Sequence, residues 1–280
     1  MQIVTTVKEI KEIIKNWKGE GKTIGFVPTM GYLHEGHGSL ITAARSQNDK
    51  VIVSIFVNPM QFGPKEDLAS YPRDLKKDSA FCESLGADLI FHPEPEEMYH
   101  KNFSSYVDMS VLTEELCGLS RPVHFRGVCT VVNKLFNIVQ PDKAYFGQKD
   151  AQQLAVIRHM TEDLNMNVEV IGCPIIREED GLAKSSRNTY LSKEERRGAL
   201  ILSKSIFMGQ KLVKEGMTDA GELVEKMKAV IETEPLARID YVKAVDGLTM
   251  QQVDTIKAPV LVAIAVYIGK TRLIDNFIVE

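Results

Sequence analysis

The chain contains few cysteines, and its four cysteines form no C-x-x-C pair. They are Cys82, Cys117, Cys129 and Cys173. This scattered spacing argues against a zinc site and against a disulfide framework, and it suits a reducing compartment. The first residues, MQIVTTVKEIKEIIKNW, lack the basic-then-apolar order and the small-residue cleavage site of a signal peptide. We therefore expect a cytoplasmic protein.

Long apolar runs and a strong net charge are also missing. No run approaches the roughly 18 to 20 apolar residues that cross a bilayer. The formal net charge is −4, so the chain lacks the basic excess of a protein that covers a large nucleic-acid surface. We expect neither a membrane nor a nucleic-acid partner. Neither G-x-x-x-x-G-K-[ST] nor G-x-G-x-x-G occurs, so a nucleotide would have to bind in another manner.

Strand-like and helix-like patterns alternate through the first part of the chain. The predicted strands are 23–27, 51–57, 88–93, 143–146 and 168–173. The predicted helices are 6–17, which a capping box from Thr6 to Glu9 opens, 37–47, 74–86, 126–140 and 148–164. Alternation of this kind indicates strands that are covered on both faces. It predicts an α/β domain with a Rossmann-like parallel sheet at residues 1–176.

The pattern changes after this domain. A second capping box, from Ser192 to Glu195, predicts the start of a long helix, and a further helix is predicted at 219–233. Three strand-like runs without long helices between them follow, at 237–246, 258–269 and 272–280. This predicts a smaller α+β domain at 177–280. Its polar loop, 177–190, is expected to close over a site on the first domain.

The stretch PTMGYLHEGHGSL, residues 28–40, places two histidines three positions apart where a strand leads into a helix. Backbone N–H groups and the helix dipole at such a position favour an anion. Gly36 and Gly38 would let a bulky ligand approach the backbone. His34 and His37 could be metal ligands, packed side chains or donors to an anion. The metal reading is disfavoured because no third and fourth ligand is evident nearby.

Three further polar stretches suggest the same chemistry. Asn58 and Gln61 follow a strand, where their amides can hydrogen-bond a carboxylate without adding charge. Lys149 and Asp150 also follow a strand, where lysine can neutralise phosphate and aspartate can accept from ribose hydroxyls. The loop 184–187 offers two cations and two hydroxyls, a natural phosphate clamp. Each stretch also has a purely structural explanation. Asn58 could belong to an ordinary turn, Asp150 could be a favourable first-turn acid beside a solvated Lys149, and the loop could be a flexible linker.

Taken together, these motifs resemble the pantothenate synthetase (pantoate–β-alanine ligase) family of the nucleotidylyl-transfer superfamily. The motifs that carry the resemblance are FVPTMGYLHEGHGSL, SIFVNPMQFGP, YPRDLKKD, FRGVCTVVNKLFNIVQPDKAYFGQKDAQQ and DGLAKSSRNTYLS. They occupy residues 26–192 in the family's order. The resemblance implies ATP-dependent ligation of (R)-pantoate and β-alanine to pantothenate, through a pantoyl-adenylate intermediate that releases pyrophosphate and then AMP. It also implies Mg²⁺ with the ATP, and a homodimer.

The resemblance further implies roles for individual residues. His34, His37 and Lys149 would be catalytic. The implied ATP-binding residues are Met30, Gly31, Tyr32, Leu33, His34, Glu35, Gly36, His37, Gly147, Gln148, Lys149, Asp150, Ile176, Lys184, Ser185, Ser186 and Arg187. The implied substrate-binding residues are Asn58, Gln61 and Gln153. Lys184 departs from the family, in which methionine most often precedes Ser-Ser-Arg, and it adds a cation near the triphosphate. The magnesium ligands are not implied, and Asp78 is one candidate.

Two other functions stay open from the residues alone. Another small-acid adenylyltransferase of the superfamily would keep the two histidines and the late loop. It would not be expected to reproduce the Asn58-Pro-x-Gln61 and Gly147-Gln-Lys-Asp150 blocks. A nucleotide-binding or RNA-binding module without activity would need a large basic face, which the net charge of −4 disfavours.

Overall fold

The computed structural model describes residues 1–64 and 66–280, which form two compact units. The first unit contains Met1–Met109, Arg121–Gln148 and Val156–Pro174, and the second contains Ser110–Ser120, Lys149–Ala155 and Ile175–Glu280. Two short segments that precede position 176 therefore belong to the second unit. The functional domain boundary at 176 stays a prediction. Among the described residues, no helix has both the length and the apolar character needed to cross a membrane.

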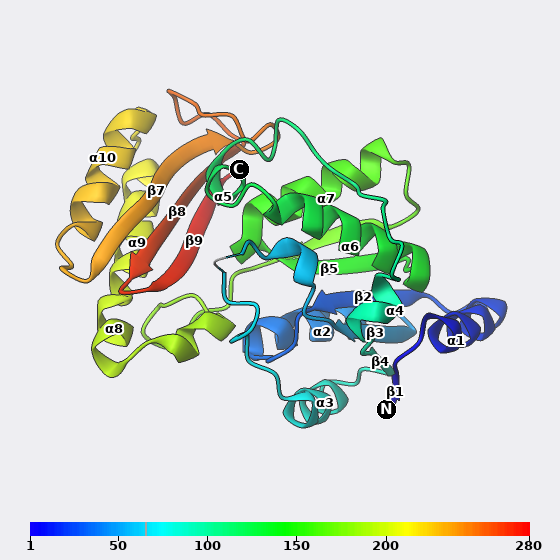
Figure 1. The fold of residues 1–280 in the computed structure, drawn as a ribbon. Coiled ribbons are helices and arrows are strands. Elements are labelled where there is room, and N and C mark those ends of the chain that lie inside the picture. The colour runs from blue at the N-terminus through cyan, green and yellow to red at the C-terminus, as the bar shows by residue number, and fades with distance from the viewer. Residues whose placement is uncertain (65) are drawn as a thin grey trace. The chain divides into compact units, whose positions relative to one another are not determined.

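The first unit is built on a six-stranded parallel sheet (Figure 1). The strands are β1 Gln2–Val4, β2 Ile24–Thr29, β3 Lys50–Ile55, β4 Leu89–Phe91, β5 Lys143–Gly147 and β6 Glu169–Cys173. Their order is β1-β4-β3-β2-β5-β6. The chain runs outward from β2 through β3 to one side and through β5 to the other. The carboxyl ends of β2 and β5 thus meet at a switch point, where ligands bind in open parallel sheets.

Helices cover both faces of this sheet, which explains the continuous apolar strand runs. The helices of this unit are α1 Val7–Gly19, α2 Glu35–Gln47, α3 Leu75–Ser84, α4 Pro95–Met98 and α6 His124–Val139, together with most of α7 Ala151–Asp163. On one face, Ile41 of α2 and Cys82 of α3 share a core with Val53. On the other, the ring of Phe136 in α6 meets Phe26 edge to face, with centroids 6.5 Å apart. The Rossmann-like sheet is confirmed.

The second unit contains a three-stranded antiparallel sheet (Figure 1). Its strands, in the order β7-β8-β9, are β7 Ala237–Asp246, β8 Val260–Ile268 and β9 Thr271–Val279. Its helices are the short α5 Leu116–Ser120, α8 Lys193–Gly198, α9 Leu200–Lys214 and α10 Ala220–Ile231. Leu223 of α10 and Ile206 of α9 lie in one core with Phe277 of β9. The α+β fold of this part of the chain is also confirmed.

Some elements differ from the sequence prediction. The capping boxes at Thr6 and Ser192 are both present, but the long helix expected after Ser192 is split at Ala199 into α8 and α9. The helix expected at 148–164 begins as a 3-10 helix, η2 Gln148–Asp150, before α7. Strand β1 was missed because three residues are too short to show a period. It forms only by pairing with β4.

Candidate active site

The two histidines form the start of α2 at the switch point. His34 is the N-cap residue, and its Nδ1 accepts a hydrogen bond from the Gly36 N–H at 3.1 Å. The N–H of His34 in turn donates to Nδ1 of His37 at 3.3 Å. The two rings lie with centroids 4.1 Å apart. This is a capping box made by imidazoles in place of the usual hydroxyl and carboxylate.

These hydrogen bonds decide where the ring protons lie. A backbone N–H can only donate, so Nδ1 of His34 and of His37 must both be acceptors. In the neutral imidazole the proton is then on Nε2 of each ring. The sequence predicted a pair of donors. The backbone hydrogen bonds to Nδ1 leave each ring with one N–H donor, which is Nε2. Helix capping and anion binding are therefore compatible uses of the same ring.

A buried carboxylate holds the turn that leads to His34. Asp78 of α3 is 1% exposed, and its two oxygens accept the N–H groups of Tyr32 and Leu33, each at 2.7 Å. Burial raises the pKa of the Asp78 carboxyl, while the two N–H donors oppose that rise. Gly31 has a φ of +82° and a Cβ there would lie 3.0 Å from the Asp78 carboxylate. The sequence suggests Asp78 only as a candidate magnesium ligand. In the structure it also holds the backbone of the turn at Tyr32 and Leu33.

Gly38 does not have the use that its place in the motif suggested. A Cβ at this position would lie 2.9 Å from the ring of Phe81 and 3.2 Å from Leu85. Gly38 therefore lets α2 pack closely on α3, and the expectation that it admits a ligand was wrong. The sequence could not show this because Phe81 lies far along the chain and meets α2 only in the fold.

Asn58 and Gln61 lie together beyond the end of β3, in a cluster of polar and sulfur atoms. Asn58 Nδ2 donates to Gln61 Oε1 at 3.1 Å, and Gln61 Nε2 lies 3.1 Å from Sδ of Met30. The hydroxyl of Tyr99 donates to Asn58 Oδ1 at 2.7 Å. Asn58 is 1% and Gln61 8% exposed. The structure thus brings three predicted residues together in the first unit, with Asn58 orienting Gln61.

Helix α6 approaches this cluster through a glycine. A Cβ on Gly127 would lie 2.4 Å from the Met60 carbonyl oxygen and 2.5 Å from Cα of Gln61. The Gly127 carbonyl accepts from Asn58 Nδ2 at 3.1 Å, and His124 Nδ1 lies 3.1 Å from the Gln61 carbonyl. These supports were missed by the sequence analysis, although Gly127 stands inside a motif that carried the family resemblance. A glycine in the first turn of an otherwise regular helix was the available signal.

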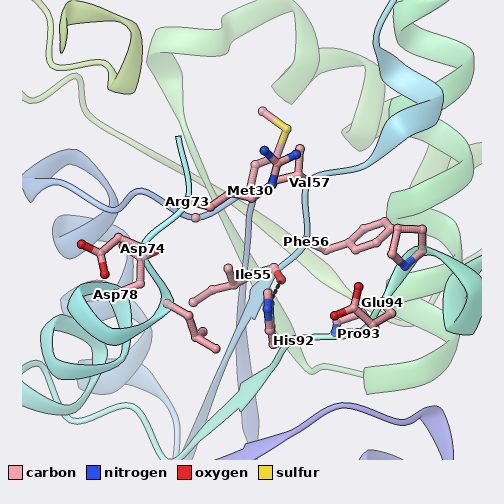
Figure 2. A pocket seen from close by; sticks show the side chains of 13 residues that line it. Met30, Ile55, Phe56, Val57, Arg73, Asp74, Asp78, His92, Pro93 and Glu94 are labelled. Atoms are coloured by element: carbon pink, nitrogen blue, oxygen red, sulfur yellow. Dashed lines mark hydrogen bonds between the residues drawn. The ribbon is translucent and has the colours of Figure 1, made fainter. Parts of the chain in front are cut away.

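A cavity of about 350 Å³ in the first unit lies beside the turn between β2 and α2 (Figure 2). Its lining includes Met30 directly after β2, Phe56 and Val57 after β3, and His92 after β4. His92 Nδ1 contacts the Ile55 carbonyl at 2.7 Å, the bond drawn in Figure 2. The cavity shares Met30 with the Asn58–Gln61 cluster. It thereby continues the switch-point edge past β2 toward β4.

Lys149 and its neighbours follow β5. Gly147 ends the strand, and a Cβ there would meet nothing within 4 Å, which leaves room for a ligand beside the backbone. Gln148, Lys149 and Asp150 form η2, with Lys149 half-buried and Asp150 exposed. Gln153 is half-buried on the first turn of α7.

The 176–187 loop of the second unit is closed by its own backbone. The Lys184 N–H donates to the Ile176 carbonyl at 2.9 Å, and the Glu178 N–H to the Leu182 carbonyl at 2.8 Å. Lys184 Nζ lies 3.0 Å from a carboxylate oxygen of Glu178. The cation predicted near a triphosphate therefore has an acidic partner in this structure. The flexible-linker alternative does not describe these residues.

The end of this loop is also ordered by local bonds. Ser185 caps the 3-10 helix η3 Ser186–Tyr190, because its hydroxyl accepts the Arg187 N–H at 3.3 Å. Ser186 is buried, while Arg187 is half-buried. The first unit thus brings together the histidine turn, Met30 and the Asn58–Gln61 cluster, and the second holds Lys149, Asp150, Gln153 and the loop.

Comparisons with known proteins identify the family and agree with the fold. The profile of the family described as Pantoate-beta-alanine ligase matches residues 2–278. A pantothenate synthetase of Ruminiclostridium cellulolyticum is 69% identical over 99% of this chain and 98% of its own length. The crystal structure of pantothenate synthetase from Thermus thermophilus superposes with a TM-score of 0.94 at 43% identity, covering 99% of both chains. A pantoate-beta-alanine ligase from Francisella tularensis, solved with beta-gamma ATP and beta-alanine, has a TM-score of 0.82 at 35% identity, covering 99% of this chain and 97% of that one.

The fold, the site and these matches define an ATP-dependent ligase built on a Rossmann-like sheet. More narrowly, the chain belongs to the pantoate–β-alanine ligase family, and its reaction is the ATP-driven joining of pantoate and β-alanine. The family prediction made from the five motifs is confirmed.

Proposed function

We propose that the ligation runs through pantoyl adenylate, with His34 and His37 stabilising the charge that develops at the α-phosphorus. The observation that carries this role is the imidazole capping box at the switch point. It fixes a proton on Nε2 of each ring and places the two donors beside a helix N-terminus, where the dipole adds to their effect. Met30 to His37 form the ATP-binding turn in this proposal.

The chemistry follows from the poor reactivity of a carboxylate. In the first step a pantoate carboxylate oxygen attacks the α-phosphorus, and the bond to pyrophosphate breaks. In the second step the β-alanine amine attacks the acyl carbon, and AMP leaves with the oxygen that pantoate supplied. The intermediate is a free mixed anhydride. Burial raises the pKa of the Cys82 and Cys129 thiols to about 12, which disfavours either as an acyl-accepting nucleophile.

The second unit contributes further ATP-binding residues to this proposal. Lys149 steadies the phosphates, and Asp150 holds the ribose together with Gly147. Ile176, Ser185, Ser186 and Arg187 complete the nucleotide site, and Lys184 exchanges Glu178 for phosphate oxygens when ATP binds. The loop shields the anhydride from water.

Pantoate is proposed to bind at Gln61, Asn58 and Gln153. Gln61 is held by Asn58 and Met30, so its amide has a fixed orientation before substrate arrives. A neutral amide can orient the carboxylate without forming an ion pair that would hold this nucleophile back. Gln152, next to Gln153, is buried and hydrogen-bonds the Cys117 N–H and the Leu112 carbonyl.

Magnesium is proposed to arrive bound to ATP. Among the residues that the structure describes, no three His, Cys, Asp or Glu side chains are grouped to hold a metal ion. This suits Mg²⁺, which usually keeps several waters and binds through substrate phosphates and about one or two carboxylates. When bound, the ion offsets part of the triphosphate charge. We also propose that the protein is a cytoplasmic homodimer, and sedimentation velocity would measure its oligomeric state.

An oxygen-transfer experiment tests the proposed route. Pantoate labelled with ¹⁸O in its carboxylate should transfer one labelled oxygen to AMP and none to pyrophosphate, because the carboxylate oxygen becomes part of the phosphate ester. Mass spectrometry of the products measures this. Label in inorganic phosphate, with ADP as the co-product, would show an acyl-phosphate route and overturn the proposal.

A second prediction concerns the pantoate site. Gln61→Glu should weaken pantoate binding at least about tenfold, because two like charges about 4 Å apart repel by roughly 1–4 kcal/mol. ATP binding should change much less. Isothermal titration calorimetry with each ligand measures both. Gln47→Glu is the matched control, since Gln47 is exposed at the far end of α2. Unchanged pantoate affinity in Gln61→Glu would remove Gln61 from the site.

A further inference from the structure

Two consecutive residues of β9, Asp275 and Asn276, hydrogen-bond two segments that are proposed to bind ATP, the 176–187 loop and the backbone at Lys149. Asp275 is 1% exposed, and its two carboxylate oxygens accept from the Arg177 guanidinium at 2.7 and 3.0 Å. Arg177 also donates to the Gly181 carbonyl at 3.1 Å, and its guanidinium lies 5.0 Å from the ring centroid of Phe207 in α9. The Arg177 guanidinium therefore ties the strand to the turn at Gly181 in the 176–187 loop.

Asn276 holds Lys149 in a corresponding way. Its side chain is nearly buried, and Nδ2 donates to the Lys149 carbonyl at 2.9 Å. Consecutive residues of a strand point to opposite faces of the sheet. Asp275 shares the face of Leu273 and Phe277, which lie in the core with α9 and α10. Asn276 therefore reaches Lys149 from the opposite face.

We propose that Asp275 and Asn276 are positioning residues for the adenylation step. Asp275 acts through Arg177 to preform the 176–187 loop, and Asn276 fixes the backbone of Lys149. The inference rests on the proposed binding of ATP by Lys149 and this loop. Because both bonds start from one rigid strand of the second unit, β9 sets the spacing between these two groups before ATP arrives.

The bonding pattern explains why the loop depends on this pair. A bidentate arginine–carboxylate contact fixes both distance and orientation, and a buried one that loses a partner leaves an uncompensated charge. Arg177 lies between Ile176 and Glu178, whose backbone groups close the loop onto Lys184 and Leu182. Loss of the contact would therefore release the hairpin at its base. The Glu178–Lys184 ion pair lies within the loop itself, so it cannot replace a contact that ties the loop to β9.

Isosteric exchanges test the proposal. Asn276→Asp replaces the donor to the Lys149 carbonyl by an acceptor, and Asp275→Asn removes the charge that faces Arg177, while neither changes side-chain volume much. We expect kcat/KM for ATP in pyrophosphate release to fall at least about tenfold, since small misplacements of catalytic groups are costly. Aminolysis of supplied pantoyl adenylate by Asn276→Asp, which leaves the shielding loop in place, should stay near the wild-type rate. Lys149→Ala should show the same division between the two half-reactions.

Hydrogen exchange separates positioning from general loosening. Without ATP, the Glu178 and Lys184 amides of the wild type should be protected, and Asp275→Asn should expose them while the β8 amides stay protected. If Asp275→Asn does not fold, Arg177→Lys is read in the same way, because it keeps the charge and loses the fork. Ile278→Ala is the control, since Ile278 shares the face of Asn276 but is 39% exposed. It should leave both readouts unchanged.

Three outcomes would overturn the proposal. They are normal adenylation by folded Asn276→Asp, equal losses in the two half-reactions, and loop amides that become protected only after ATP is added. The ¹⁸O experiment on the wild type is independent of all three. A failure of the adenylate route therefore remains distinguishable from a failure of this inference.

Discussion

His37→Ala is expected to lower the rate of adenylation by roughly 10²-fold or more, as the loss of one donor from an oxyanion site does. The reason is that the His37 ring carries its proton on Nε2, with Nδ1 already occupied by the His34 N–H. The alanine removes both this donor and the capping acceptor. Pyrophosphate release under single-turnover conditions measures the effect on the first step alone.

A second variant separates the two uses of the ring. Glutamine is favoured at the third helical position of a capping box, so His37→Gln should keep the cap and the stability of α2 while losing the imidazole donor. We expect its adenylation rate to be as low as that of the alanine variant. His100→Ala, which changes an exposed histidine of the same unit, is the control. Near-normal adenylation by folded His37→Gln would show that the ring only caps the helix.

Asp78→Asn is expected to reduce both stability and turnover. The amide keeps one acceptor for the Tyr32 and Leu33 N–H groups but turns an N–H toward the other, and an unsatisfied buried group costs about 1–3 kcal/mol. The free energy of unfolding should fall by that amount in urea denaturation. Turnover should fall roughly 10- to 100-fold, because the turn that places His34 is no longer fixed.

The matched control for Asp78→Asn is Asp74→Asn. Asp74 caps α3 by accepting the Lys77 N–H, and asparagine caps a helix about as well as aspartate, so this variant should stay near the wild type. Raising the magnesium concentration distinguishes the two roles considered for Asp78. A magnesium ligand would be partly rescued by excess Mg²⁺, whereas a residue that holds the backbone would not. Full rescue would contradict the positioning role.

The predictability of the fold depended on the length of each element. Strand β3 contains the buried β-branched run Val51, Ile52 and Val53, which is typical of a strand covered on both faces, and it was predicted. Strand β1 has three residues and exists because β4 offers an unpaired edge, so no local pattern could reveal it. The break at Ala199 was also missed, although Gly198, a weak helix former, stands directly before it. A Cβ on Gly198 would lie 3.1 Å from Glu234, a contact that the sequence does not show.

The predictability of the site depended on whether a residue acts by its own chemistry. His34, Lys149 and Gln61 were found because their side chains and their places after strands suggest what they bind. Asp78, Gly127 and Asp275 were not assigned their structural uses, because each acts by holding a backbone or by leaving room for one. Such uses depend on which distant segment lies within about 3 Å, the reach of a hydrogen bond.

By itself, the sequence determined the α/β and α+β parts, the family and the residue types available for adenylation. Periodicity, capping residues and ordered motifs are local properties, and they can be recognised without knowledge of the fold. Only the tertiary structure decided which distant groups hold those residues in place. It anchors the turn that leads to His34 on the distant Asp78 carboxylate of α3. It also ties Lys149 and Arg177 to β9, because hydrogen bonds and ion pairs between distant segments exist only once the chain has folded.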